Sequence, residues 1–393
     1  MIGKPLGKVL LCTLLVLTWV WMPRAEALTF AGLDQGAAIA TIRQECGGTD
    51  LVCLGHKLEE FTAAGGPVAA FEVLNRAIAT KAVVAQDDFH EMAHHIGRAT
   101  ARTFGVNPEA FAACPDSFNY GCQHGFFQAA LAEEPDLVAT SRKICDSGQS
   151  TQSRAEFYCF HGVGHGVMMA KMYDLEASLA VCDRLEGSRA EGCWQGVFME
   201  NINGETNGMG QAGVFADDPL APCNTVDRRY RYQCYINHAS HLLRRSGMSV
   251  AAASRLCLRA EEHLKPCLES IGIMATNPGW QTAVVGAGGS FYDKALRICQ
   301  EFPADLRHYC IGSGVDNLAA NYTTDIETSV QFCRRVPQSD RAFCFGRIGA
   351  SIADKLPVGD DGSQACVGVP KAYRPDCEAG LHRYYAYRSK ATG

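Results

Sequence analysis

The sequence predicts an all-α protein built from disulfide-stapled helical hairpins, about eight to nine units of about 35 residues that stack like an α-solenoid. Three observations lead to this fold class: an apolar N-terminal segment typical of export, an even number of cysteines in close pairs, and short helix-like stretches flanking those pairs. A single two-helix unit buries little apolar surface, so neighbouring units must stack. A compact disulfide-rich α domain without a regular superhelix is the alternative.

The N-terminal segment has the pattern of a signal peptide. Lys4 and Lys8 supply positive charge, an apolar run extends from Val9 to Trp21, and Ala25-Glu26-Ala27 offers a small-x-small cleavage site. The apolar run has the length of a signal-peptide core and is short for a membrane span. We therefore expect residues 1–27 to be removed and the protein to be periplasmic or secreted. An uncleaved segment retained as an anchor is the alternative.

The remaining chain, residues 28–393, is expected to form a single helical repeat domain. No later segment approaches about 20 consecutive apolar residues, so no membrane span is expected after signal cleavage. The formal net charge is −6, and loss of the signal peptide, with three basic residues and one acidic residue, makes it −8. A negative surface repels phosphate backbones, and no basic stripe with interleaved aromatics occurs, so nucleic acid is not an expected partner.

Cysteine is the most informative residue type in the chain. There are 19 cysteines, and removing Cys12 with the signal peptide leaves an even 18. In an oxidising compartment such a number indicates a disulfide framework, and the absence of any CxxC motif speaks against cysteine zinc sites. The cysteines fall into nine close pairs, each predicted to be bonded: 46/53, 114/122, 145/159, 182/193, 223/234, 257/267, 299/310, 333/344 and 366/377.

The sequence around the pairs predicts helical hairpins. Helix-like stretches such as Leu175–Val181 precede the first cysteine, and small-residue-rich apolar stretches such as Gly196–Met199 follow the second. From Cys122 to Cys377, the second cysteines of successive pairs lie 33 to 43 residues apart. Arg, Asp and Pro between the cysteines indicate a turn. A disulfide at the base of each hairpin should contribute roughly 2–4 kcal/mol by restricting the unfolded chain.

The histidines are concentrated in one part of the chain. Two pairs, His90/His94 and His161/His165, have a spacing of four residues. Side chains four apart on a helix project from the same face, which is the geometry that two imidazoles need to share a metal ion. His238 and His241 form a further close pair, which we expect to be an ordinary polar face rather than an extension of this stripe.

The hairpin register brings further histidines together. His124 and His161 both lie two residues after the second cysteine of their unit. Glu200 lies seven residues after the second cysteine of the following unit, next to the register position of His165, which is six residues after its own second cysteine. Stacked helices lie about 10 Å apart, and the glycines beside the histidines allow close approach, so these side chains should converge. The predicted metal ligands are His94, His124, His161 and His165, with Glu200 as a fifth ligand or as a catalytic acid/base.

Cysteines that are paired in disulfides cannot serve as ligands. Imidazoles with one carboxylate suit zinc, iron, copper or manganese, so the expected cofactor is a divalent transition metal of unknown identity. The sequence thus predicts an exported metal-binding repeat protein, either a metal-dependent oxidoreductase or a hydrolase, acting on an unknown small molecule or peptide. Residues 80–205 would form the metal-site half, and residues 206–393 a structural or binding half.

Two alternatives remain. His90-Glu91-Met92-Ala93-His94 matches the HExxH pattern of zinc proteases, in which the glutamate activates water and both histidines bind the metal. Gly97 suits an extended form of that motif, but Thr100 stands where a third histidine is required. The other alternative is a metal-free solenoid that binds a peptide or envelope partner on its concave face, which is the common use of repeat proteins.

Overall fold

The computed structural model describes residues 32–83, 89–147, 153–206, 217–286, 288–321, 326–356, 362, 364 and 366–391, and within these ranges the regular secondary structure is helical throughout. The all-α prediction is therefore confirmed. The predicted signal peptide, residues 1–27, lies outside the described residues. Among the described helices, none is both long enough and apolar enough to cross a membrane.

The first half of the chain contains nine α-helices among the described residues. They are α1 (Gln35–Glu45), α2 (Leu51–Ala79), α3 (Phe89–Phe104), α4 (Pro108–Ala112), α5 (Ser117–Ala130), α6 (Leu137–Cys145), α7 (Ser153–Ala170), α8 (Leu175–Cys182) and α9 (Ser188–Thr206). Inside α2 the backbone breaks at Gly66, which has a φ of 82° and precedes Pro67. Proline has no backbone N–H to donate to the helical hydrogen-bond ladder, so the helix breaks at the residue directly before Pro67.

The second half continues with shorter helices. They are α10 (Arg228–Tyr235), α11 (Ala239–Arg245), α12 (Val250–Cys257), the 3-10 helix η1 (Leu258–His263), α13 (Leu264–Ala275), α14 (Pro278–Val285), α15 (Phe291–Gln300), α16 (Arg307–Asn321), α17 (Glu327–Arg335), α18 (Gln338–Lys355), the 3-10 helix η2 (Lys371–Tyr373) and α19 (Arg374–Ala391). Many of these helices begin at a side-chain N-cap. Ser249 caps α12 and Asn277 caps α14, each accepting a hydrogen bond from a backbone N–H in the first turn.

Nine disulfides staple the helices, and each joins a cysteine to the next one along the chain. The bonded pairs are Cys46–Cys53, Cys114–Cys122, Cys145–Cys159, Cys182–Cys193, Cys223–Cys234, Cys257–Cys267, Cys299–Cys310, Cys333–Cys344 and Cys366–Cys377. This confirms every predicted pair. In a typical unit a short helix ends at the first cysteine, as α8 does at Cys182, and the second cysteine lies in the first turns of the longer helix that follows.

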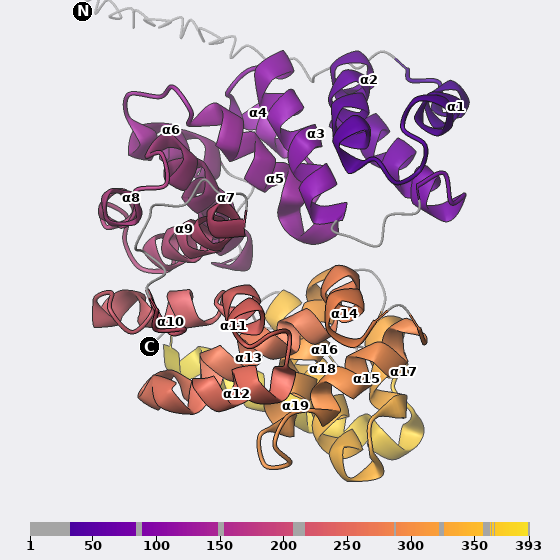
Figure 1. The fold of residues 1–393 in the computed structure, drawn as a ribbon, viewed down its shortest axis with the longest axis vertical. Coiled ribbons are helices and arrows are strands. Elements are labelled where there is room, and N and C mark those ends of the chain that lie inside the picture. Colours follow the sequence, from indigo (N-terminus) through magenta and orange to yellow (C-terminus); the bar gives the residue numbers. More distant parts are fainter. Residues whose placement is uncertain are drawn as a thin grey trace, which may run out of the picture.

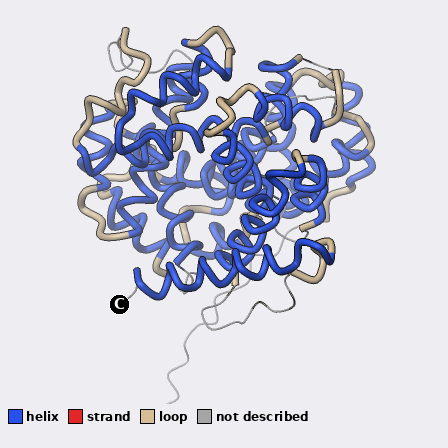
Figure 2. Tube along the Cα trace, turned by 90° about the horizontal axis from the view of Figure 1, so that it is seen from below, coloured by secondary structure: helices blue, strands red, loops and turns tan. Residues whose placement is uncertain are grey.

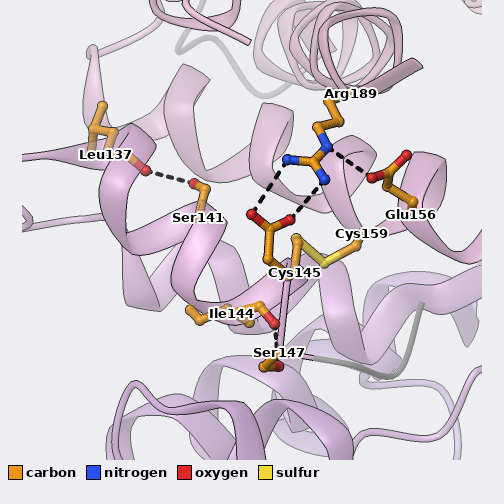
Figure 3. The surroundings of a disulfide bond; sticks show 9 residues. Leu137, Ser141, Ile144, Cys145, Ser147, Glu156, Cys159 and Arg189 are labelled. Atoms are coloured by element: carbon orange, nitrogen blue, oxygen red, sulfur yellow. Dashed lines mark hydrogen bonds and ion pairs between the residues drawn. A yellow bond between two sulfur atoms is a disulfide. The ribbon is translucent and has the colours of Figure 1, made fainter. Parts of the chain in front are cut away.

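The surroundings of one disulfide show how neighbouring units are tied together (Figure 3). The Cys145–Cys159 bond closes the hairpin of α6 and α7. Arg189, at the start of α9 in the next unit, donates from Nε to the Glu156 carboxylate of α7 at 2.7 Å. The base of each hairpin is thus held covalently within its own unit and, at this position, by an ion pair to the next.

The two halves of the chain face each other across a cavity. In Figure 1, α1–α9 form the upper part and α10–α19 the lower part, and Figure 2 shows the rounded outline from below. The cavity, of about 1440 Å³, is lined from both halves by residues that include Tyr158, Met199, Trp280, Phe291 and Tyr384. Helix α9 contacts α10, and α5 contacts α16. The inner faces of the units therefore enclose a common space, and a regular superhelix stays a prediction.

Candidate metal centre

Four successive long helices, α3, α5, α7 and α9, pack side by side at very short distances. A Cβ at Gly125 of α5 would lie 2.0 Å from the backbone oxygen of His94 on α3. A Cβ at Gly196 of α9 would lie 1.9 Å from the backbone oxygen of His161 on α7. Only glycine fits at either position, because any side chain would collide with the backbone of the neighbouring helix. This close packing brings imidazoles from three helices within contact distance.

Five histidine rings gather where these helices meet. Ring centroids are 4.5 Å apart for His90 and His94, 5.1 Å for His90 and His124, 4.8 Å for His124 and His161, and 5.1 Å for His161 and His165. All of these rings except that of His90 are almost completely buried. All five sequence-predicted histidines thus lie in one cluster, including His90, which the sequence had associated with the HExxH alternative.

The nitrogen atoms that face one another have the spacing of ligands to a common ion. Nε2 of His90 lies 3.0 Å from Nε2 of His94 and 3.3 Å from Nδ1 of His124. Nε2 of His161 lies 3.2 Å from Nε2 of His165. Two nitrogen ligands about 2.0–2.1 Å from a tetrahedral zinc ion are separated by roughly 3.3 Å. The observed separations are close to that value.

Hydrogen bonds to oxygen fix the orientation of two rings. Nδ1 of His90 lies 2.7 Å from the backbone oxygen of Phe118, and Nδ1 of His165 lies 2.8 Å from Oε2 of Glu200. Because these oxygens accept, each Nδ1 carries a proton and Nε2 is the nitrogen that each ring turns towards the cluster. Such outer hydrogen bonds are typical of metal-ligating histidines, whose tautomer and ring orientation they set.

The other three rings contain buried nitrogens with no hydrogen-bond partner among the described residues. These atoms are Nδ1 of His94, Nε2 of His124 and Nδ1 of His161. Glu91 Oε2 lies 3.3 Å from Nδ1 of His94, but the two atoms are not aligned for a hydrogen bond. Burial lowers the pKa of His94, His124 and His161 well below the usual histidine value, and the neighbouring imidazoles lower it further, while a contact with Gln195 partly offsets this effect at His161. These rings are therefore neutral at pH 7, the form that binds metals.

Glu200 on α9 supports the cluster from one side. Its Oε2 accepts from His165 and, at 3.4 Å, from Gln128, while its Oε1 accepts from the Tyr173 hydroxyl at 2.7 Å. Burial alone would raise the pKa of Glu200, but the hydrogen bonds from His165, Tyr173 and Gln128 hold it below the usual value. Burial and the adjacent Glu200 raise the pKa of Tyr173. Glu200 is thus an anionic anchor for His165, with both oxygens engaged.

Sequence reasoning missed Tyr173 and Gln128. Gln128 lies six residues after its unit's second cysteine, the same register as His165, so the register could have identified it. Tyr173 lies in the turn between α7 and α8, where no periodic pattern places it.

Glu91 lies on the other side of the cluster, at the wall of the cavity. Its side chain is about half exposed (49%), and Arg98 lies 3.3 Å from its Oε1. Although half of the side chain meets solvent, the surrounding cavity wall partly desolvates the carboxylate and raises the pKa of Glu91, and Arg98 partly offsets this effect. Thr100, at the position of the third histidine of the extended zinc-protease motif, instead donates to the backbone oxygen of Ile96. The histidine that joins His90 and His94 comes from α5 and is His124.

The His238–His241 pair is buried, so the expectation of an ordinary polar face is wrong. Its burial results from the packing of α10 and α11 against α13. Nε2 of His238 donates to the backbone oxygen of Pro219 at 2.8 Å, and Nδ1 of His241 lies 2.9 Å from Oε1 of Glu205. Cys223 and Cys234 lie near His238, but their sulfurs form a disulfide and cannot bind a metal. Each histidine of this pair thus forms a hydrogen bond to a neighbouring part of the chain, and the pair is separate from the five-histidine cluster.

The cluster is accessible from the cavity. His90, His161, Glu91 and Glu200 contribute to the cavity lining, whereas His94, His124 and His165 lie behind them. A molecule in the cavity would therefore meet two of the imidazoles and both carboxylates. In comparisons with protein-family models, curated proteins and solved structures, no match to this chain was found.

Proposed function

We propose that this chain is an exported protein that binds a divalent transition metal at the five-histidine cluster of α3, α5 and α7. The observation that carries the proposal is the meeting of imidazole nitrogens 3.0–3.3 Å apart, with His90 and His165 oriented by outer hydrogen bonds. Nine disulfides fit an extracellular or secreted protein, because such bonds persist in oxidising compartments.

The competing explanation for the cluster is a chain of N–H···N hydrogen bonds between neutral rings. Such bonds can satisfy the facing nitrogens of His90 and His165, but they leave Nδ1 of His94, Nε2 of His124 and Nδ1 of His161 without partners among the described residues. Each buried polar group without a hydrogen bond costs roughly 1–3 kcal/mol. Metal bonds to the facing nitrogens would offset this cost, because they contribute free energy that a hydrogen-bonded cluster does not supply. The metal-binding explanation is therefore the stronger one.

The donor set favours a metal of intermediate softness. The atoms that face one another in the cluster are imidazole nitrogens. The nearest carboxylates, Glu91 and Glu200, lie at its edge, beside His94 and His165. Imidazole suits zinc, copper, iron and nickel, whereas magnesium and calcium prefer oxygen ligands. We expect zinc or copper under oxidising conditions, and the ion would supply Lewis acidity to a bound molecule.

We further propose that the protein is an enzyme acting on a small molecule in the cavity. Glu91 lies at the cavity wall beside His94, and its half-exposed carboxylate is placed to take up a proton from water or substrate. Glu200 has both oxygens hydrogen-bonded, so we assign it the positioning of His165 rather than the acid/base role considered from sequence. Hydrolysis with Glu91 as the base is the reaction that this arrangement supports best.

The test is the metal content of the protein after export into an oxidising compartment. Elemental analysis should find a transition metal in wild type and much less of it in His161→Gln. The matched control is His308→Gln, which replaces an exposed histidine of α16 and should retain the wild-type content. Equal metal content in wild type and His161→Gln, with both folded by circular dichroism, would refute the metal site.

Glu91→Gln separates binding from catalysis. This variant should keep its metal, because the proposed ligands are histidine nitrogens and not the Glu91 carboxylate. It should lose hydrolytic turnover, because Glu91 is the proposed base. Loss of metal in Glu91→Gln would instead make this carboxylate a ligand.

A second candidate function is the zinc-protease chemistry of the HExxH motif. It is favoured by one observation: His90 and His94 share a group with His124, and Glu91 lies beside them. Under this alternative His161 and His165 are dispensable for the metal. Metal retained in His161→Gln but lost in His90→Gln, together with cleavage of peptide substrates, would favour it over the five-histidine site.

A further inference from the structure

The five histidines divide into two groups of three that share one member. Atoms of His90, His94 and His124 lie within 4.8 Å of one another, and so do atoms of His124, His161 and His165. Each group combines a pair four residues apart on one helix, α3 or α7, with the single histidine of α5, which packs between them. The arrangement has approximate twofold character, with His124 at its centre.

The ring nitrogens of His124 have different surroundings. Nδ1 lies 3.3 Å from Nε2 of His90, which places it in the first group. Nε2 is buried and has no hydrogen-bond partner among the described residues. The His124 ring stacks on that of His165 at 4.7 Å with an interplanar angle of 16°, and it lies 4.8 Å from that of His161. The second group therefore lies against this ring, with His165 on its face, and Nε2 is the ring nitrogen that the first group does not engage.

One ion cannot use both nitrogens of an imidazole, because their lone pairs point away from each other. A single ion at the first group would leave His161 and His165 without a role, and a single ion at the second would leave His90 and His94 without one. Each group also contains one ring that an oxygen acceptor fixes for ligation, His90 by Phe118 and His165 by Glu200. Such fixation in both groups is expected if both hold metal.

We propose that the cluster holds two divalent transition-metal ions, one at each helical histidine pair, with the imidazole of His124 binding both. This inference rests on the proposed function and extends it from a metal site to a dinuclear centre. When both nitrogens of His124 form bonds to metal, the single ring proton is released to water and the ring becomes a bridging anion. That negative charge then lies between the two cations and reduces their repulsion.

The first test counts the ions. The exported, disulfide-bonded protein is stripped with a chelator, reloaded with excess Zn²⁺, freed of loose metal and analysed. Wild type should bind two ions per chain, and His90→Gln and His161→Gln should each bind one. His308→Gln should bind two, since this exposed residue belongs to neither histidine group. A wild type that binds one ion overturns the dinuclear centre but leaves the proposed function standing, whereas a wild type that binds none refutes both.

The second test asks whether the ions share a ligand. With Cu²⁺ as the probe, an imidazole bridge couples the two unpaired spins and suppresses the normal resonance of an isolated copper ion. Wild type should show that suppression, and the one-ion variants His90→Gln and His161→Gln should recover the isolated-ion signal. Two ions with uncoupled signals would overturn the shared His124. These variants replace one histidine of each outer pair and leave the central ring in place, so the test does not depend on a His124 variant folding.

Discussion

The two halves of the chain place polar side chains on the same inner face of the same kind of hairpin, but they use them differently. In the first half, the position two residues after the second cysteine holds His124 and His161, whose buried rings each contain a nitrogen without a hydrogen-bond partner among the described residues. In the second half the corresponding position in α13 holds Glu269. The hairpin frame thus sets where a side chain points, and the residue type decides what chemistry is possible there.

On the cavity wall of the second half, one group of polar side chains, Arg347, Asp316 and Ser351, is paired internally. Nε of Arg347 on α18 donates to both oxygens of Asp316 on α16 at 2.9 and 3.0 Å, and the Ser351 hydroxyl donates to Oδ1 at 2.6 Å. Close helix packing is not what separates the halves, because a Cβ at Gly349 of α18 would lie 1.8 Å from the backbone oxygen of Cys377. A paired inner face stabilises the fold, whereas unpartnered imidazoles are available to a ligand.

The largest expected effect concerns His238, a buried histidine that belongs to neither inner face. Burial lowers its pKa to about 3, with His241 as a further cause, so the folded state does not take up a proton there until strongly acid pH. The unfolded chain is protonated below about 6.5, so stability is lost as the pH falls from about 6.5 towards 3, by up to about 4–5 kcal/mol. Urea unfolding at pH 7 and pH 4 should show a markedly smaller acid loss in His238→Gln than in wild type. Equal acid losses would contradict this.

The next prediction tests whether removal of a disulfide in the second half affects the metal site in the first half. Replacing Cys333 and Cys344 with alanine removes the bond between α17 and α18 and should lower the free energy of unfolding by about 3 kcal/mol, because the unfolded chain is less restricted. The metal content of the folded protein should not change, since stacked units contact mainly their neighbours. Denaturant unfolding and elemental analysis measure the two quantities. Metal loss in a folded variant would show that the halves are coupled.

A smaller effect compares one glycine from each half. Gly125→Ala should destabilise the protein by about 2 kcal/mol, since the new methyl group must push α5 away from α3, and overpacking costs typically 1–3 kcal/mol. Gly312→Ala in α16 is the matched control, because a Cβ there would lie 3.4 Å from the nearest atom, at the end of the Phe343 side chain. The control should change stability little, and only Gly125→Ala should also weaken metal binding. Similar losses from both substitutions would mean that helix spacing does not matter more at the histidine cluster.

The smallest effect concerns the ion pair of the second half. Arg347→Met removes the pairing with Asp316 but keeps much of the side-chain length, and both partners are about one-third exposed. Such pairs contribute up to about 1 kcal/mol, so a loss of that order is expected in thermal or denaturant unfolding. Metal content and metal affinity should stay at the wild-type values. A change in affinity would mean that the opposite wall of the cavity takes part in the site.

Local patterns allowed much of the fold to be predicted. Even cysteine number and short spacing identified every disulfide, because each bond closes a loop between neighbours in sequence. The four-residue spacing of His161 and His165 placed both rings on one face of α7, and the shared register brought His124 next to them. These are short-range consequences of helix geometry and stacking, which sequence periodicity records directly.

Other features depend on contacts that no local pattern records. The bond from Tyr173 to Glu200 arises because the turn after α7 folds back over α9. His238 is buried because α10 and α11 pack inward, a contact that its local sequence, between Asn237 and Ala239, does not record. The cavity lining includes Trp280 and Tyr384 together with His90 and His161 of the cluster, because of the relative placement of the two halves. Periodicity describes a helix face but not which distant face it meets.

The disulfide pattern also has a consequence for biosynthesis. From Cys46 to Cys377, every cysteine bonds to its nearest neighbour along the chain, with separations of 7 to 14 residues. A chain that emerges N-terminus first into an oxidising compartment presents the two members of a native pair before the next pair arrives. An oxidase that joins thiols in order of emergence therefore makes the native set, and the slow thiol–disulfide exchange that repairs wrong pairs is not required. Maturation of this protein should depend on the supply of oxidant rather than on a disulfide isomerase.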